Sequence, residues 1–107
     1  MRCDEYRLWV ALHGCYICYF VVPLNGQYVE RDGFPGAKHA EAVSQACHTE
    51  NNGTSSKGPD SSCVPLCPHH HAVYDQGRKS FEWFFKVDMK AIAAQYYAAW
   101  LAEGNKP

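Results

Sequence analysis

Two short cysteine-led motifs constrain this chain more than any other feature. The first is Cys15-x-x-Cys18, and the second, about fifty residues later, is Cys67-x-x-His70, which His71 follows at once. Each motif can close a tight turn that presents two ligands to one ion, and four such ligands are typical of tetrahedral zinc. The pair therefore predicts a structural zinc site. Its fourth ligand could come from any of three consecutive histidines, and the spacing of Cys67-x-x-His70 favours His70.

The size of the chain fits a small domain stabilised by a metal. With 107 residues, the sequence makes one domain of modest core, residues 1–107, to which a bound metal can add folding free energy. The six cysteines could instead form three disulfides of a secreted scaffold. However, no apolar run is long enough for a signal peptide or approaches the roughly 20 residues of a membrane span. We therefore expect a cytoplasmic protein with no membrane partner, in which paired cysteines bind metal.

Charge gives no global argument for a nucleic-acid partner. The net charge is −1, whereas proteins that bind phosphate usually present a basic face. Basic residues do gather locally, and they could line a groove for phosphates or simply form a solvated face: Lys57, Arg78, Lys79, Lys86 and Lys90.

Turn and cap residues predict a small α/β domain. Asn25-Gly26 between two apolar runs indicates a hairpin, and Asp88 suits the start of the last helix. Residues 31–39 and 49–62 are rich in turn-forming residues, and residues 40–47 are ambiguous. The expected elements are a helix at 4–12, a hairpin at 20–24 and 27–30, a strand at 63–66, a helix from 68 to before Gly77, and a helix at 89–103.

Several side chains are expected to have structural roles only. Tyr6, Trp9, Val10 and Leu12 are available to the core from the first helix, whereas His13 is expected in an exposed loop. The three aromatic residues 83–85 are expected to pack the last helix onto the core rather than to stack on bases.

A second set of ligating residues remains after the zinc ligands are assigned. His71 and Asp75 are spaced i,i+4 on the helix after the second motif, so both can grip one cation. Cys47 and His48 lie at the end of the segment expected to face that helix. A histidine near a divalent ion can deprotonate water while the ion stabilises the charge that develops on a phosphodiester. The surplus set therefore predicts a metal-dependent nuclease.

The chain resembles the HNH endonucleases, in particular the compact zinc-knuckle proteins of phages and bacteria. The resemblance extends from Tyr6 to Trp100, with an unusual insertion between Cys18 and Ala46. It is carried by Tyr6, Trp9, Leu12, Cys15 and Cys18, then by Ala46-Cys47-His48, Gly53, Lys57, Asp60 and Val64-Pro65-Leu66-Cys67, and finally by His70-His71, Gly77, Phe81 and Val87-Asp88. It implies a ββα-metal core of treble-clef-like form, with a structural zinc and flanking N- and C-terminal helices.

The resemblance also implies roles for individual residues. Structural zinc would be held by Cys15, Cys18, Cys67 and His70. His48 would be the general base, and His71 and Asp75 would bind a catalytic divalent ion, which could be Mg, Mn, Ni or Zn. Lys57, Arg78 and Lys79 are expected to hold the phosphates of DNA. Such a nuclease would work in a bacterial or phage-infected cell, where other DNA-processing proteins are possible partners.

Two positions depart from the family pattern. Cys47 stands where the family usually has His or Asp as a metal ligand, and Ser62 stands near the middle Asn. A thiolate is a softer ligand than a carboxylate, so Cys47 would favour zinc over magnesium unless it is only a buried apolar residue. The alternative function is a non-catalytic zinc module that binds nucleic acid or protein. Asp75 could in that case simply accept hydrogen bonds at the helix end.

Overall fold

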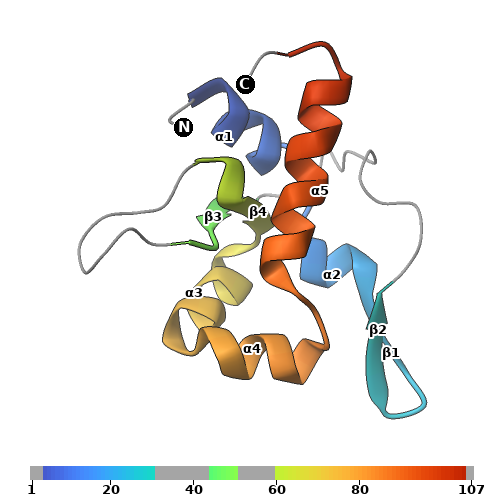
Figure 1. The fold of residues 1–107 in the computed structure, drawn as a ribbon. Helices are drawn as coiled ribbons and strands as arrows, with labels where there is room; N and C mark the ends of the chain where they lie inside the picture. The colour runs from blue at the N-terminus through green and yellow to red at the C-terminus, as the bar shows by residue number, and fades with distance from the viewer. Residues whose placement is uncertain (1–3, 31–43, 51–59, 106–107) are drawn as a thin grey trace.

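The computed structural model describes residues 4–30, 44–50 and 60–105. Two helices are followed along these ranges by the strands of two small antiparallel sheets and then by three more helices (Figure 1), which makes a small α/β domain as predicted. The elements are α1 (Asp4–Ala11), α2 (Tyr16–Phe20), β1 (Val21–Leu24), β2 (Gln27–Glu30), β3 (Gln45–His48), the 3-10 turn η1 (Asp60–Ser62), β4 (Cys63–Leu66), α3 (Pro68–Gln76), α4 (Arg78–Phe85) and α5 (Met89–Ala102).

The first hairpin, β1–β2, forms around Asn25-Gly26 as predicted. Asn25 has φ 52° and Gly26 has φ 79°, the left-handed conformations that a tight two-residue hairpin turn requires. The strands pair from Val21 opposite Glu30 to Leu24 opposite Gln27. The hairpin projects away from the body of the molecule beyond α2 (Figure 1).

The second hairpin, β3–β4, leads directly into α3. Residues 45–48 form β3, which includes the last three residues of the ambiguous stretch 40–47, and the strand predicted at 63–66 is confirmed as β4. The register places Gln45 opposite Leu66 and His48 opposite Cys63. Every residue of β4 is buried, so this hairpin lies in the core. The predicted loop at 31–39 and residues 51–59 of the predicted loop at 49–62 lie outside the described residues.

The C-terminal helix α5 runs alongside the hairpin and α1 (Figure 1). Asp88 caps it as predicted, because the Asp88 carboxylate accepts a hydrogen bond from the Ala91 amide at 3.2 Å. An aromatic core joins α1 to α5, with the rings of Tyr6 and Trp100 5.3 Å apart. Among the described residues, no helix is long and apolar enough to cross a membrane.

Two expectations for the N-terminal region are wrong. Leu12 is 53% exposed, because α1 ends at Ala11 and Leu12 falls outside its buried stripe. His13 is buried rather than exposed, with its ring 4.3 Å from that of Trp9 and its Nδ1 2.7 Å from the Trp9 carbonyl oxygen. This histidine therefore completes the aromatic core.

Candidate metal sites

The two cysteine-led motifs lie at the N-termini of two helices. Cys15 directly precedes α2 and Cys67 directly precedes α3, while Cys18 and His70 lie in the first turn of each helix. Pro68 occupies the first turn of α3, where its missing N–H costs nothing, and the Cys67 Sγ accepts a hydrogen bond from the His70 amide at 3.4 Å. The local sequence thus fixes the backbone geometry of the second motif without help from a metal.

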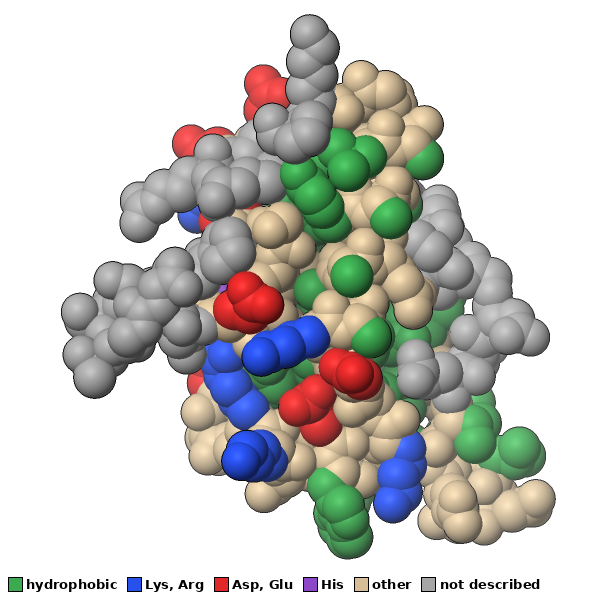
Figure 2. Space-filling model, in the orientation of Figure 1, with side chains coloured by type: hydrophobic (Ala, Val, Ile, Leu, Met, Phe, Trp, Pro, Cys, Tyr) green, Lys and Arg blue, Asp and Glu red, His purple; other side chains and the backbone are tan. Residues whose placement is uncertain are grey.

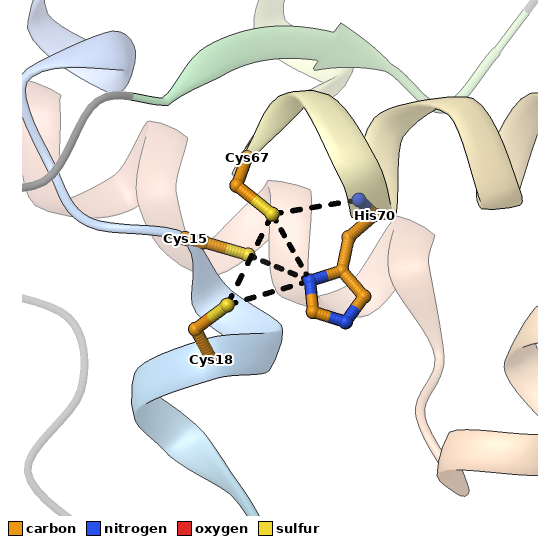
Figure 3. Close-up of side chains that lie close together, drawn as sticks. All are labelled: Cys15, Cys18, Cys67 and His70. Carbon is orange, nitrogen blue, oxygen red and sulfur yellow. Dashed lines mark hydrogen bonds between the residues drawn. The ribbon is translucent and has the colours of Figure 1, made fainter.

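The four predicted zinc ligands meet at one point (Figure 3). The Sγ atoms of Cys15, Cys18 and Cys67 lie 3.5, 3.4 and 3.2 Å from His70 Nδ1, and Cys18 Sγ lies 4.0 Å from Cys67 Sγ. Zinc with ordinary bond lengths and tetrahedral angles would separate sulfur from nitrogen by about 3.6 Å and sulfur from sulfur by about 3.8 Å. The cluster therefore has the size of a tetrahedral zinc site.

The electrostatics of this cluster also suit a cation. Burial raises the pKa of the Cys15 thiol, and burial together with the neighbouring Cys15 raises the pKa of Cys18 to about 12. Burial lowers the pKa of His70, which keeps its imidazole neutral and able to donate a lone pair. A divalent cation would favour the thiolate forms and remove their mutual repulsion. These four residues are positioned to hold a metal ion such as zinc.

A second group combines Cys47 of β3 with His71 and Asp75 of α3. One ligating atom from each lies within 4.8 Å of the others. The i,i+4 spacing brings His71 Nε2 within 3.4 Å of Asp75 Oδ2, and Cys47 is fully buried beneath them. A thiolate, an imidazole and a carboxylate together fit a borderline ion such as zinc better than magnesium.

Gln45 of β3 orients His71. The amide oxygen of Gln45 lies 2.7 Å from His71 Nδ1, so Nδ1 donates its proton to that oxygen. In the neutral imidazole, the Nε2 lone pair then faces the Asp75 carboxylate. Either a proton on Nε2, which would make an ion pair with Asp75, or a metal ion bound between the two groups would satisfy both acceptors. An outer partner of this kind is typical of histidines that bind metal.

His48 lies in a different place from Cys47. Its Nε2 donates to Asp60 Oδ1 at 2.9 Å, and Cys63 completes a third group of possible ligands. Arg7 of α1 approaches the other carboxylate oxygen of Asp60 at 3.4 Å, so a positive side chain already balances this carboxylate. Consecutive residues of a strand point to opposite faces, which separates His48 from the Cys47 group.

Two of the three predicted phosphate ligands are described. Arg78 begins α4, with its Nη2 3.5 Å from Asp75 Oδ1 and its guanidinium 4.8 Å from the centre of the Tyr74 ring. Lys79 is exposed beside it, whereas Lys57 lies outside the described residues. Arg78 therefore borders the second group, where it can meet an anion that approaches the ion.

Sequence reasoning missed the partners that lie far away along the chain. Gln45 carried no metal-binding signal, because an amide that orients a ligand belongs to no spacing pattern. Arg7 was not connected with His48, since the contact runs through Asp60 across three elements.

Comparisons with known protein families, with characterised proteins and with solved structures find no match for this chain. Function is therefore inferred from the residues and contacts of this protein.

Proposed function

We propose that this protein is a metal-dependent HNH-type endonuclease that hydrolyses phosphodiester bonds in DNA. One observation carries the proposal: Cys47, His71 and Asp75 converge where the β3–β4 hairpin meets α3. A hairpin followed by a helix that supplies metal ligands is the arrangement of a ββα-metal core. The cysteine and histidine cluster at the start of α3 would provide its structural zinc.

The residues around this group have complementary roles in the proposed reaction. A bound divalent ion would stabilise the negative charge that develops on the phosphodiester oxygens. Gln45 would hold His71 in the tautomer that binds the ion. Arg78 is anchored by Asp75 and Tyr74, so its remaining N–H groups can bind a phosphate, and the exposed Lys79 can bind the next one.

His48 remains the proposed general base. Asp60 accepts from its Nε2, which leaves Nδ1 as the site that would take a proton from water. Because His48 and Cys47 lie on opposite faces of β3, the DNA strand would have to cross the edge of this strand to reach both.

The burial of His48 favours a second candidate function. Its side chain is 9% exposed and paired with Asp60, as a histidine with only a structural role would be. A non-catalytic zinc module that binds nucleic acid or protein would keep the same fold and cluster.

A plasmid-nicking assay distinguishes the two. The zinc-loaded protein is incubated with supercoiled plasmid and magnesium, manganese, nickel or zinc. We expect nicking by the wild type and its loss in His71→Ala and Asp75→Asn, because both remove a ligand of the second group. Glu5→Gln changes an exposed carboxylate on α1 and should keep full activity. Nicking that survives both ligand changes would contradict the proposal. DNA binding without cleavage of plasmid or of a single-stranded oligodeoxynucleotide under every ion would establish the binding module.

A further inference from the structure

Two large aromatic side chains of α4 face solvent. Trp83 is 72% exposed and Phe84 is 53% exposed, so the expectation that residues 83–85 all pack against the core is wrong for these two. Their neighbours Phe81 and Phe85 are buried and fill the inward face of α4. The outward pair, Trp83 and Phe84, is here called the aromatic ridge, and it leaves more than half of its side-chain surface to solvent.

Hollows flank the aromatic ridge. A groove of about 660 Å³ lies between α3 and α4, with Phe81 and Phe85 among its lining and His69 and Val73 on the α3 side. A smaller groove of about 430 Å³ separates the ridge from the tip of the β1–β2 hairpin, where Tyr28 packs 5.4 Å from the Phe84 ring. A flat ring inserted beside the ridge would therefore find apolar walls.

Basic side chains border the aromatic ridge. Lys86 ends α4 in the left-handed conformation, with φ 59°, and its Nζ lies 5.0 Å from the centre of the Trp83 ring. Arg78 and Lys79 begin the same helix. The carboxylate of Glu82 accepts from the Met89 amide at 2.8 Å, which occupies one of its oxygens. Figure 2 shows Lys and Arg side chains near projecting hydrophobic ones at the lower edge of the molecule, with acidic side chains above them.

The larger groove beside the ridge and the second metal group lie on opposite faces of α3. At about 100° per residue, His71 and Asp75 lie on one side of a helix, whereas His69, Val73 and Gln76 lie on the other. The two faces are about 10 Å apart, the diameter of a helix with its side chains. An extended strand of nucleic acid could therefore contact both within a few nucleotides.

We propose that the aromatic ridge binds unpaired bases of single-stranded DNA. Bases have flat apolar faces that stack on tryptophan and phenylalanine, while the lysines near the ridge match the phosphates between them. In a duplex these faces are already stacked on each other, so the ridge selects single-stranded or unpaired substrate. The inference rests on the proposed function for the identity of the ligand, and it names the form of DNA that the nuclease takes.

The fluorescence of Trp83 reports binding directly. Among the three tryptophans, Trp9 and Trp100 are 7% and 6% exposed, so a solute in water reaches mainly Trp83. The zinc-loaded protein is titrated with a short single-stranded oligodeoxynucleotide and no added divalent ions. The experiment therefore measures binding alone and does not depend on nuclease activity. We expect the oligonucleotide to quench the emission, whereas an abasic strand with the same phosphates or the matching duplex leaves it nearly unchanged.

Variants separate stacking from general loss of apolar surface. Trp83→Ala should weaken single-strand affinity, measured by anisotropy of a labelled strand, by roughly 5- to 100-fold, the effect of losing one stacked base. Phe84→Ala should weaken it as well, and Leu8→Ala, which removes an exposed apolar side chain from α1, should not.

Three results would overturn the inference. They are equal affinity of wild type and Trp83→Ala, equal binding of the abasic strand, and a change in Trp83 emission that depends on protein concentration alone, which would assign the ridge to contact between two copies. Plasmid nicking is measured separately. Single-strand binding without cleavage of either plasmid or a single-stranded oligodeoxynucleotide in any ion would support the ridge and reject the nuclease. Cleavage with no effect of Trp83→Ala on binding would do the reverse.

Discussion

At the scale of single residues, Cys47 would decide which ion the second group prefers in the proposed nuclease. Its thiol is fully buried and lies within 4.8 Å of ligating atoms of His71 and Asp75. Replacing this soft ligand with a carboxylate, in Cys47→Asp, should shift nicking activity from zinc or nickel toward magnesium or manganese. The measurement is the rate of nicking in each ion. Glu5→Gln, which changes an exposed carboxylate on α1, is the control and should keep the wild-type order of ions.

His48 is the residue for which stability and catalysis must be separated. Removing its imidazole in His48→Ala leaves the Asp60 carboxylate, which is 5% exposed, with Arg7 as its remaining described ion-pair partner. We expect unfolding in urea to show a loss of about 1–3 kcal/mol, the usual effect of leaving a buried polar group without its hydrogen bond. If His48 is also the general base, nicking falls by roughly 10²-fold or more at temperatures where the variant is folded.

The variant Asp60→Asn is compared with His48→Ala. The Asp60→Asn change keeps the His48 imidazole but removes the carboxylate charge that orients it. Wild-type stability in His48→Ala would contradict the structural role of the contact, and wild-type nicking in the same variant would reject the general base.

At the scale of elements, the zinc cluster joins the N-termini of α2 and α3. Cys67 is one of the four candidate ligands, and it also caps α3 because its Sγ accepts a hydrogen bond from the His70 amide. Cys67→Ala should therefore lose one equivalent of tightly bound zinc per chain and lower the midpoint of thermal unfolding. Zinc content by elemental analysis and a melting curve measure the two effects, with Glu5→Gln on the exposed side of α1 as the variant that keeps its zinc. A Cys67→Ala protein with full zinc and an unchanged melting curve would exclude this site.

Local signals explain which elements could be predicted from the sequence. Asn25-Gly26, Pro68 and Asp88 each fix backbone geometry by themselves, so the first hairpin, α3 and α5 were predictable. Neither α2 nor α4 was, because the residues that precede them, Cys15 and Gly77, make no side-chain cap. The position of α2 depends on the Cys15, Cys18, Cys67 and His70 cluster, and that of α4 depends on the burial of Phe81 and Phe85. Tertiary contacts of this kind produce no local sequence pattern.

The candidate site shows the same division between local and distant contacts. His71 and Asp75 could be paired from their spacing on one helix, and His70 from its spacing to Cys67. The contacts of Gln45 with His71 and of Asp60 with His48 join β3 to other elements, so they depend on the fold. Sequence therefore indicated the ligands but not the residues that orient them.

At the scale of the whole molecule, the burial of tyrosines makes the stability of the fold depend on pH in the alkaline range. Burial raises the pKa of the Tyr6 and Tyr96 phenols, and it raises that of Tyr74 to about 12. The folded state thus favours the neutral phenol, whose ordinary pKa is about 10. Stability is fully present below about pH 10, and it is lost as the pH rises from there through the folded pKa.

Tyr74→Phe tests this dependence while keeping the ring that packs 5.2 Å from Phe81. The variant has no phenol to ionise, so its urea midpoint should fall less than that of the wild type between about pH 9 and pH 12. Tyr28→Phe, at a half-buried position on β2, controls for loss of a hydroxyl group. Because α3 carries both Tyr74 and His70, one of the candidate zinc ligands, opening of this part of the core should also release any zinc bound there. Parallel loss of stability in wild type and Tyr74→Phe would show that ionisation of this phenol does not limit the alkaline stability of the fold.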